Sequence, residues 1–134
     1  MNDVFITYRH FRLFDEKDGE MLPKGGATLA FFVDLRDPEN RHAIVGWALC
    51  SPEDHFSKSV GRQVAYTTLN FIRRQFKGFD SNYVATCRFE VEHKEDGGTL
   101  CAQFLTHIEG LYDSLNEGDE LYLLSRWLRR HNII

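Results

Sequence analysis

Hydroxyl, basic and aromatic residues are concentrated where an apolar, strand-like run gives way to a helical pattern. This stretch, residues 46–62, is the strand-to-helix junction, and its residues best suited to contact a ligand are Phe56, Ser57, Lys58, Gly61 and Arg62. A helix N-terminus presents unpaired N–H groups and the positive end of the helix dipole, and cationic side chains add to both. We therefore expect the junction to bind an anion.

Gly61 is the residue of the junction that most needs an explanation. A glycine inside a helix costs about 1 kcal/mol relative to alanine, so a close approach by a ligand or by backbone would compensate for it. The alternative is that Gly61 packs the helix onto Gly46 and Ala48, a strip of the preceding strand that is bare of large side chains. The junction matches no standard phosphate-binding loop, so both interpretations stay open.

A second group of cations lies in the last predicted helix. It consists of Arg126, Arg129 and Arg130, beside Trp127. Arginines next to an aromatic ring can bind a phosphate and stack on a base, although the helix dipole alone also favours cations at a C-terminus. A joint site would require this helix to approach the junction within one chain or across a dimer. Arg9 and Arg12 of the first predicted strand could contribute to it.

Cys50, followed by Asp54 and His55, is the candidate nucleophile. A thiolate at a helix N-terminus would be activated, but three residues so close along the chain do not guarantee the geometry of a triad. Cys50 also ends an apolar strand, which favours a buried structural thiol. We expect no catalytic residue and no enzyme, and a cysteine-dependent hydrolase is the minor alternative.

The sequence shows no pattern typical of a metal site. Its six histidines are scattered without ligand-like spacing. The order of strands and helices is superficially that of ribonuclease H-like nucleases, whose chemistry needs acids on the first and fourth strands to hold divalent metal. The first predicted strand has no acid in its interior, and Asp34 lies near the end of the second. We expect neither a metal nor a cofactor.

Hydrophobic periodicity predicts the elements that position these residues. Alternation predicts strands over 4–13, 27–35, 42–49 and 83–93, and helical spacing predicts helices over 51–77, 101–115 and beyond Asp119. The first few residues of the range 101–115 could instead form a strand that pairs back across Gly97 and Gly98. Ser51 followed by Pro52 is typical of a helix start, Ser57 is a second candidate cap, and Gly78 suits the helix end.

These elements predict a single α+β domain over residues 1–134. We expect an antiparallel sheet of about four strands, beginning with a three-stranded meander, with the helices packed on one face. Apolar residues make up 43% of the 134 residues and aromatic residues 13%, which is typical of a globular chain.

Charge, cysteine content and hydropathy limit the partners and the compartment. The net charge of -4 argues against bulk electrostatic binding of nucleic acid. Three widely spaced cysteines are typical of free thiols in a reducing compartment. No basic segment precedes an apolar run, and no apolar stretch approaches the roughly 20 residues that span a bilayer. We expect no secretion signal and no membrane partner.

The junction resembles a segment found in small bacteriophage proteins. The residues that carry this resemblance are Gly46, Ala48, Cys50, Pro52, Asp54, Phe56, Ser57, Lys58, Gly61, Arg62 and Ala65. In size and in its strands-then-helix plan, the chain is similar to the Thoeris anti-defence sponges, phage proteins that sequester cyclic ADP-ribose-type signals without cleaving them. The resemblance implies a homo-oligomer in the host cytoplasm, with pockets between protomers in which Arg62 and Phe56 contact a small cyclic nucleotide.

A second class of function is a protein-binding inhibitor of a bacterial defence complex, such as an anti-CRISPR protein. Its acidic side chains would meet a basic nucleic-acid groove of the target. The acids suited to this role are Asp113, Glu117, Asp119 and Glu120. A sponge predicts a thermal shift with cyclic nucleotides, whereas an inhibitor predicts a stable complex with a defence protein.

Overall fold

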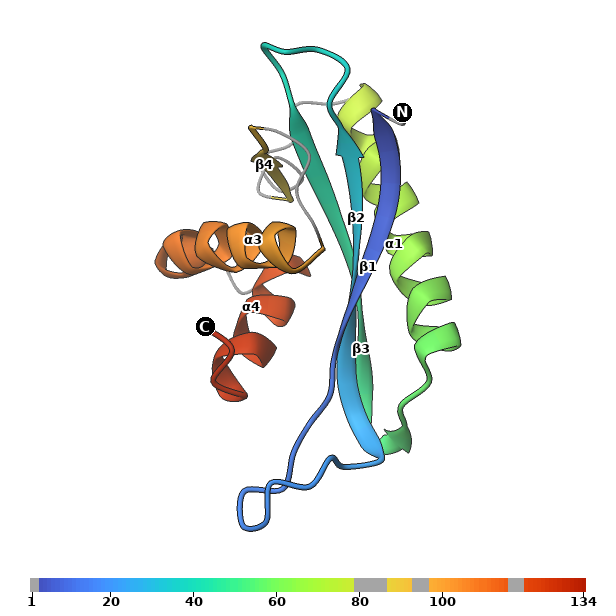
Figure 1. The fold of residues 1–134 in the computed structure, drawn as a ribbon, viewed down its shortest axis with the longest axis vertical. Coiled ribbons are helices and arrows are strands. Elements are labelled where there is room, and N and C mark those ends of the chain that lie inside the picture. Colours follow the sequence, from blue (N-terminus) through green and yellow to red (C-terminus); the bar gives the residue numbers. More distant parts are fainter. Residues whose placement is uncertain (1–2, 79–86, 93–96, 116–119) are drawn as a thin grey trace.

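The computed structural model describes residues 3–78, 87–92, 97–115 and 120–134 as a sheet flanked by helices (Figure 1). The elements follow along the chain as β1 Val4–Phe11, β2 Lys24–Asp34, β3 His42–His55, α1 Lys58–Gly78, β4 Arg88–Glu90, α3 Gly97–Leu111, the 3-10 helix η1 Tyr112–Ser114 and α4 Glu120–Arg130. The strands form one antiparallel sheet in the order β1-β2-β3-β4. The predicted α+β class, the four-stranded sheet and the N-terminal meander are confirmed.

The register of the sheet decides which residues share a face. His10 lies opposite Thr28, and Thr28 lies opposite Ala48. Two residues further along β2, on the same face, Ala30 lies opposite Gly46 of β3. Because neighbouring residues of a strand point to opposite faces, the even-numbered residues of these three strands form one face and the odd-numbered residues form the other.

Helix α1 covers the even-numbered face. A Cβ built on Gly46 would lie 2.6 Å from the Cα of Leu69, so only glycine lets the helix backbone come this close. Ala65, Leu69 and Ile72 of α1 are buried. Further along the helix, the guanidinium of Arg73 lies 3.6 Å from the centroid of the Phe32 ring.

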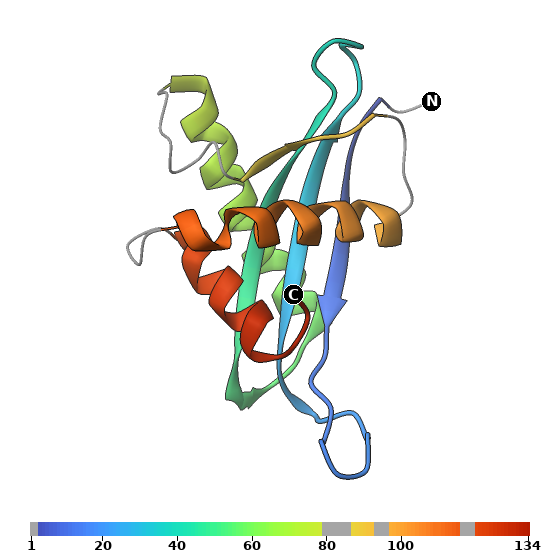
Figure 2. The same cartoon turned by 90° about the vertical axis from the view of Figure 1, so that its left-hand side faces the viewer.

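Helices α3 and α4 lie on the opposite face of the sheet (Figures 1 and 2). Phe31 of β2 packs edge-on against Phe89 of β4 and Phe104 of α3, with ring centroids 6.1 and 5.7 Å apart. The prediction that the helices pack on one face is wrong. Its physical reason lies in β2, where every residue of 25–33 is buried, so neither face of the central strand can be left to solvent.

Strand β3 is longer, and helix α1 starts later, than predicted. The pairing of Lys24 with His55 continues β3 to His55, across an irregularity of β2 between Lys24 and Gly26. The predicted helix start at Ser51 is therefore wrong, because this segment pairs with β2. The second candidate cap is the one used: the N–H of Val60 donates to Ser57 Oγ at 3.2 Å.

The C-terminal half is helical as predicted, with different bounds. Helix α3 begins at Gly97, so the competing strand over this segment is excluded. Of the predicted strand 83–93, residues 88–90 form β4, while 83–86 and 93 lie outside the described residues, as does Asp119. Within the described ranges, no helix has both the length and the apolar character needed to cross a bilayer.

Candidate functional site

Helix α1 touches the sheet at Gly61 and so divides the junction into two sides. A Cβ built on Gly61 would lie 3.1 Å from Thr28 Cβ and closer still to the Thr28 hydroxyl. Gly61 therefore serves a tight contact between helix and sheet, as the packing interpretation predicted, but its partner is Thr28 of β2 and not the strip of Gly46 and Ala48. Arg62, the next residue, acts electrostatically on β1, whereas Val60, the preceding residue, lines a pocket on the β3 side.

Four basic groups converge on the β1 side of α1. This basic cluster consists of His10, Arg12, Lys58 and Arg62. Lys58 and Arg62 are one helical turn apart on α1, so they lie on the same flank of the helix. His10 lies on the face of β1 that α1 covers.

The Phe56 ring and the Thr28 hydroxyl hold the strand half of the cluster in place. His10 Nδ1 and Thr28 Oγ1 share a hydrogen bond of 2.8 Å. The His10 ring meets the Phe56 ring edge-on at 5.7 Å, and the Arg12 guanidinium lies 4.5 Å from the centroid of the same ring. Arg12 also donates from Nη2 to the Leu22 carbonyl at 3.0 Å. Two basic side chains are thus positioned by one aromatic ring at the start of α1.

Burial and the neighbouring cations both make the His10 imidazole hard to protonate. Partial burial lowers the pKa of His10, and the nearby charges of Arg62, Lys58 and Arg12 lower it further, in that order. A cationic neighbour disfavours a second cation, and the repulsion is relieved when an anion binds. The cluster therefore combines three permanent positive charges with a neutral imidazole and suits a multiply charged anion.

On the β3 side, α1 and the end of β3 enclose a pocket of about 340 Å³. Its wall is formed mainly by Ala48, Leu49 and Cys50 of β3 and by Val60 and Val64 of α1. Phe56, Ser57, Gly61 and Thr28 also line this pocket. Thr28 and Phe56 contact His10 as well, so they form the partition between the pocket and the basic cluster.

The Cys50 thiol is surrounded by backbone carbonyl groups. Its Sγ lies 3.5, 3.6 and 3.7 Å from the carbonyl oxygens of Asp54, Ser51 and His55. Carbonyl oxygens accept a hydrogen bond from a thiol but offer no general base for it. The residues that were candidates for a triad thus meet the sulfur through their main chain.

The arginines of α4 lie on the face of the sheet opposite the junction (Figures 1 and 2). Arg129 lies 4.1 Å from the centroid of the Tyr112 ring, and Arg126 is exposed. Arg130 lines an open groove of about 930 Å³ together with His10 and Arg12. Of the three arginines of α4, Arg130 alone lines this groove with His10 and Arg12. None of the three lines the pocket that holds Phe56, Ser57 and Gly61.

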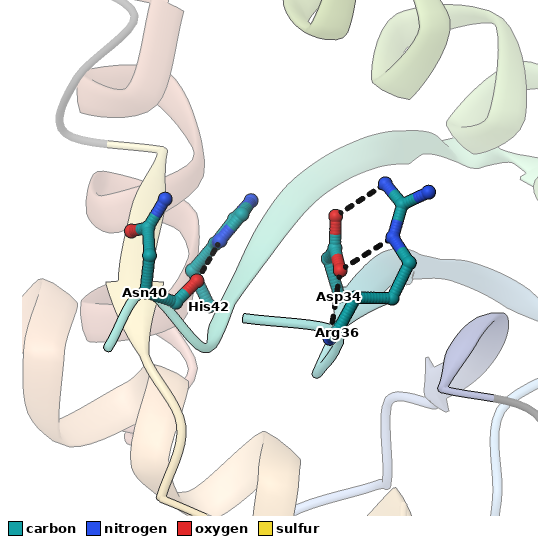
Figure 3. A network of polar contacts seen from close by, with 4 residues as sticks. All are labelled: Asp34, Arg36, Asn40 and His42. Atoms are coloured by element: carbon teal, nitrogen blue, oxygen red, sulfur yellow. Dashed lines mark hydrogen bonds and ion pairs between the residues drawn. The ribbon is translucent and has the colours of Figure 1, made fainter. Parts of the chain in front are cut away.

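Asp34 is the last residue of β2, where the chain enters the turn toward β3 (Figure 3). Arg36 donates from Nε and Nη2 to the two carboxylate oxygens, at 3.0 and 2.8 Å. This bond, more than any other effect, lowers the pKa of Asp34 to about 2. The described ranges contain no group of three or more His, Cys, Asp or Glu residues placed to hold a metal ion. Asp34 is held by Arg36.

No protein-family profile, curated protein or solved structure matches this chain.

Sequence reasoning missed one residue of the cluster and left another uncertain. His10 was seen only as a scattered histidine, and Arg12 only as a possible contributor beside Arg9. Alternation along β1 could have found them, because it places His10 and Arg12 on one face and Arg9 on the other. Arg9 lies opposite Leu29 on the odd-numbered face, away from the junction, and its charge acts on the Cys101 thiol of α3.

Proposed function

We propose that the protein binds a small, multiply charged anion at the basic cluster. The observation that supports this proposal is the convergence of His10, Arg12, Lys58 and Arg62 beside the first turn of α1. Arginine and lysine are the side chains most used to bind phosphate, and the helix N-terminus adds the positive end of its dipole. The site uses Lys58 and Arg62 as the sequence predicts and adds two residues of β1.

The ligand class that we propose is a cyclic nucleotide signal of the cyclic ADP-ribose type. Two phosphates in one molecule match several cations, and the two residues that the resemblance to Thoeris anti-defence sponges implicates both lie here. Arg62 is a member of the cluster, and Phe56 contacts two others. The corresponding role is that of a bacteriophage protein that sequesters a defence signal in the host cytoplasm.

We propose a binder in preference to an enzyme. Cys50 lies on the β3 side of α1 and contacts carbonyl oxygens, so it is separated from the cluster by Phe56 and Gly61. The groups that meet a ligand at the cluster are cations and one imidazole, which hold charge without supplying a nucleophile. A cyclic nucleotide bound there would be retained intact.

A homo-oligomer is part of the same proposal. Arg126 lines neither the groove that holds His10, Arg12 and Arg130 nor the pocket that holds Phe56, and we propose that it joins the site from a second copy. On α1, Val60, Val64 and Phe71 follow helical spacing and are 56%, 46% and 48% exposed. Such a stripe is suited to contact another protomer, and light scattering of the purified protein will give its mass in solution.

Calorimetric titration with cyclic ADP-ribose isomers and cyclic oligonucleotides tests the proposed function. We expect at least one of them to bind, to be recovered intact after denaturation of the protein, and to lose at least ten-fold in affinity in Arg62→Ala. Arg74→Ala is the matched control, since Arg74 is exposed on the same helix three turns further along. Absence of binding by every probe, or equal losses in the two variants, would overturn the proposal.

A further inference from the structure

Two rows of side chains face each other across the gap between α1 and β1. Lys58, Arg62 and Tyr66 recur every four residues and form the row on α1. Tyr8 and His10 alternate along β1 and form the opposite row, which Arg12 continues beyond the end of the strand. Four helical residues rise about 6 Å and two strand residues about 6.7 Å, so the two rows have nearly the same pitch.

The rows run in opposite directions, because α1 runs against β1 (Figure 1). Lys58 and Arg62 therefore lie beside His10, and Tyr66 lies beside Tyr8 one turn further along. The electrostatic neighbours agree with this order. The charges that act on His10 are those of Arg62, Lys58 and Arg12, whereas the groups that act on Tyr8 are Tyr66 and Arg62.

The surface thus changes in character along the gap, from cations to tyrosines. The cations belong to the first turn of α1 and the end of β1, and the two phenol rings follow within one helical turn. Tyr66 is 42% exposed, so its ring is accessible to a ligand. Tyr8 lies beneath it on the sheet and is only partly exposed.

We propose that Tyr66 and Tyr8 bind the flat ring of a nucleotide whose phosphates occupy the basic cluster. This inference rests on the proposed function and deepens it, since it names the residues that distinguish a nucleotide from an inorganic polyphosphate. Aromatic side chains stack on bases of any sequence, because every base has a π-face. One sugar separates the phosphate and the base of a nucleotide, and one helical turn separates Arg62 from Tyr66.

The hydroxyl groups of the tyrosines can add directional contacts. The pKa of Tyr8 is raised, because burial and the neighbouring Tyr66 outweigh the opposite effect of Arg62. The phenol of Tyr8 therefore stays protonated at neutral pH. A protonated phenol can donate a hydrogen bond to a ring nitrogen or a sugar oxygen. The apolar pocket on the β3 side is less suited to the ring, because Phe56 and Thr28 separate it from the cluster.

Calorimetric titrations with ADP and with pyrophosphate test this inference, because the two probes share a diphosphate and differ in the nucleoside. We expect ADP to bind at least ten-fold more tightly than pyrophosphate. Tyr66→Leu, which keeps apolar bulk and removes the ring, should lower the affinity for ADP about ten-fold and leave that for pyrophosphate unchanged. Tyr66→Phe should retain most of the affinity for ADP. Leu123→Ala is the control, because it removes an exposed apolar side chain from α4, on the other face of the sheet.

The outcomes separate the inference from the proposed function. If Arg62→Ala weakens both probes while Tyr66→Leu changes neither, the inference is wrong and anion binding at the cluster stands. Equal affinity of the parent protein for ADP and pyrophosphate would also overturn the inference. If neither probe binds and the cyclic nucleotides do not bind, the inference and the proposed function fail together.

Discussion

Gly61 of α1 rests directly on Thr28 of β2, and the same Thr28 hydroxyl is hydrogen-bonded to His10. The contact between the helix and the sheet and the position of the imidazole in the basic cluster therefore depend on one side chain. A change at Gly61 should affect both the stability of the fold and the site.

Gly61→Ala should destabilise the protein by about 1–2 kcal/mol, because the overpacking exceeds the gain in helix propensity. Thermal or denaturant unfolding measures this. Gly110→Ala is the control, since a Cβ at Gly110 of α3 would meet nothing within 4 Å and should be neutral or slightly stabilising. Thr28→Ala should recover part of the loss when combined with Gly61→Ala. A Gly61→Ala protein as stable as the parent would show that the contact is not tight.

The pKa of His10, lowered below its ordinary value of 6.5, predicts how stability depends on pH. The unfolded chain binds the proton more tightly than the folded chain, so the free energy of unfolding falls as the pH drops through 6.5 toward the folded-state pKa. His10→Gln should flatten this slope, as followed by urea unfolding across that range. His131, whose pKa burial and Arg130 also lower, leaves a residual slope that His131→Gln should reduce separately. An unchanged slope in His10→Gln would contradict the electrostatic description of the cluster.

The Asp34 carboxylate should titrate with a pKa of about 2 in the folded protein, which NMR of the side-chain carboxyl can measure. Because this value lies below the ordinary 3.8, the pair with Arg36 stabilises the fold above pH 3.8, and its contribution is lost as the pH falls through about 2. Arg36→Ala should move the midpoint up toward 3.8. The effect on unfolding should be small, since Arg36 is 67% exposed and solvent screens the pair. A midpoint that does not move would assign the shift to another group.

The sequence predicted the first two strands and the start of the third to within a few residues, because their alternation is local. It did not predict where β3 ends, since Ser51 followed by Pro52 suits a helix start and only the distant pairing of Lys24 with His55 excludes one. The burial of both faces of β2 could have been inferred from the nearly continuous apolar run at 27–33, which has no polar face to offer to water.

The candidate site was predicted in part for a similar reason. Ser57, Lys58 and Arg62 follow one another along a helix start, so their proximity is visible in the chain. His10 lies 48 residues before Lys58, and only the register of β1 on β2 and the seating of α1 bring the two together. The contribution of Phe56 to positioning His10 and Arg12 likewise depends on the turn that follows β3.

Helix α1 meets the sheet at two glycines, Gly46 under Leu69 and Gly61 over Thr28. At Gly46 the spacing between the layers is set by the main chain of Leu69, and at Gly61 it is set by the buried Thr28 side chain, whose hydroxyl is already hydrogen-bonded to His10. The side chains that α1 presents toward β1 therefore project from a helix whose position over β2 and β3 is already set. Little ordering of that helix remains to be done on binding, which lowers the entropic cost of holding a ligand there.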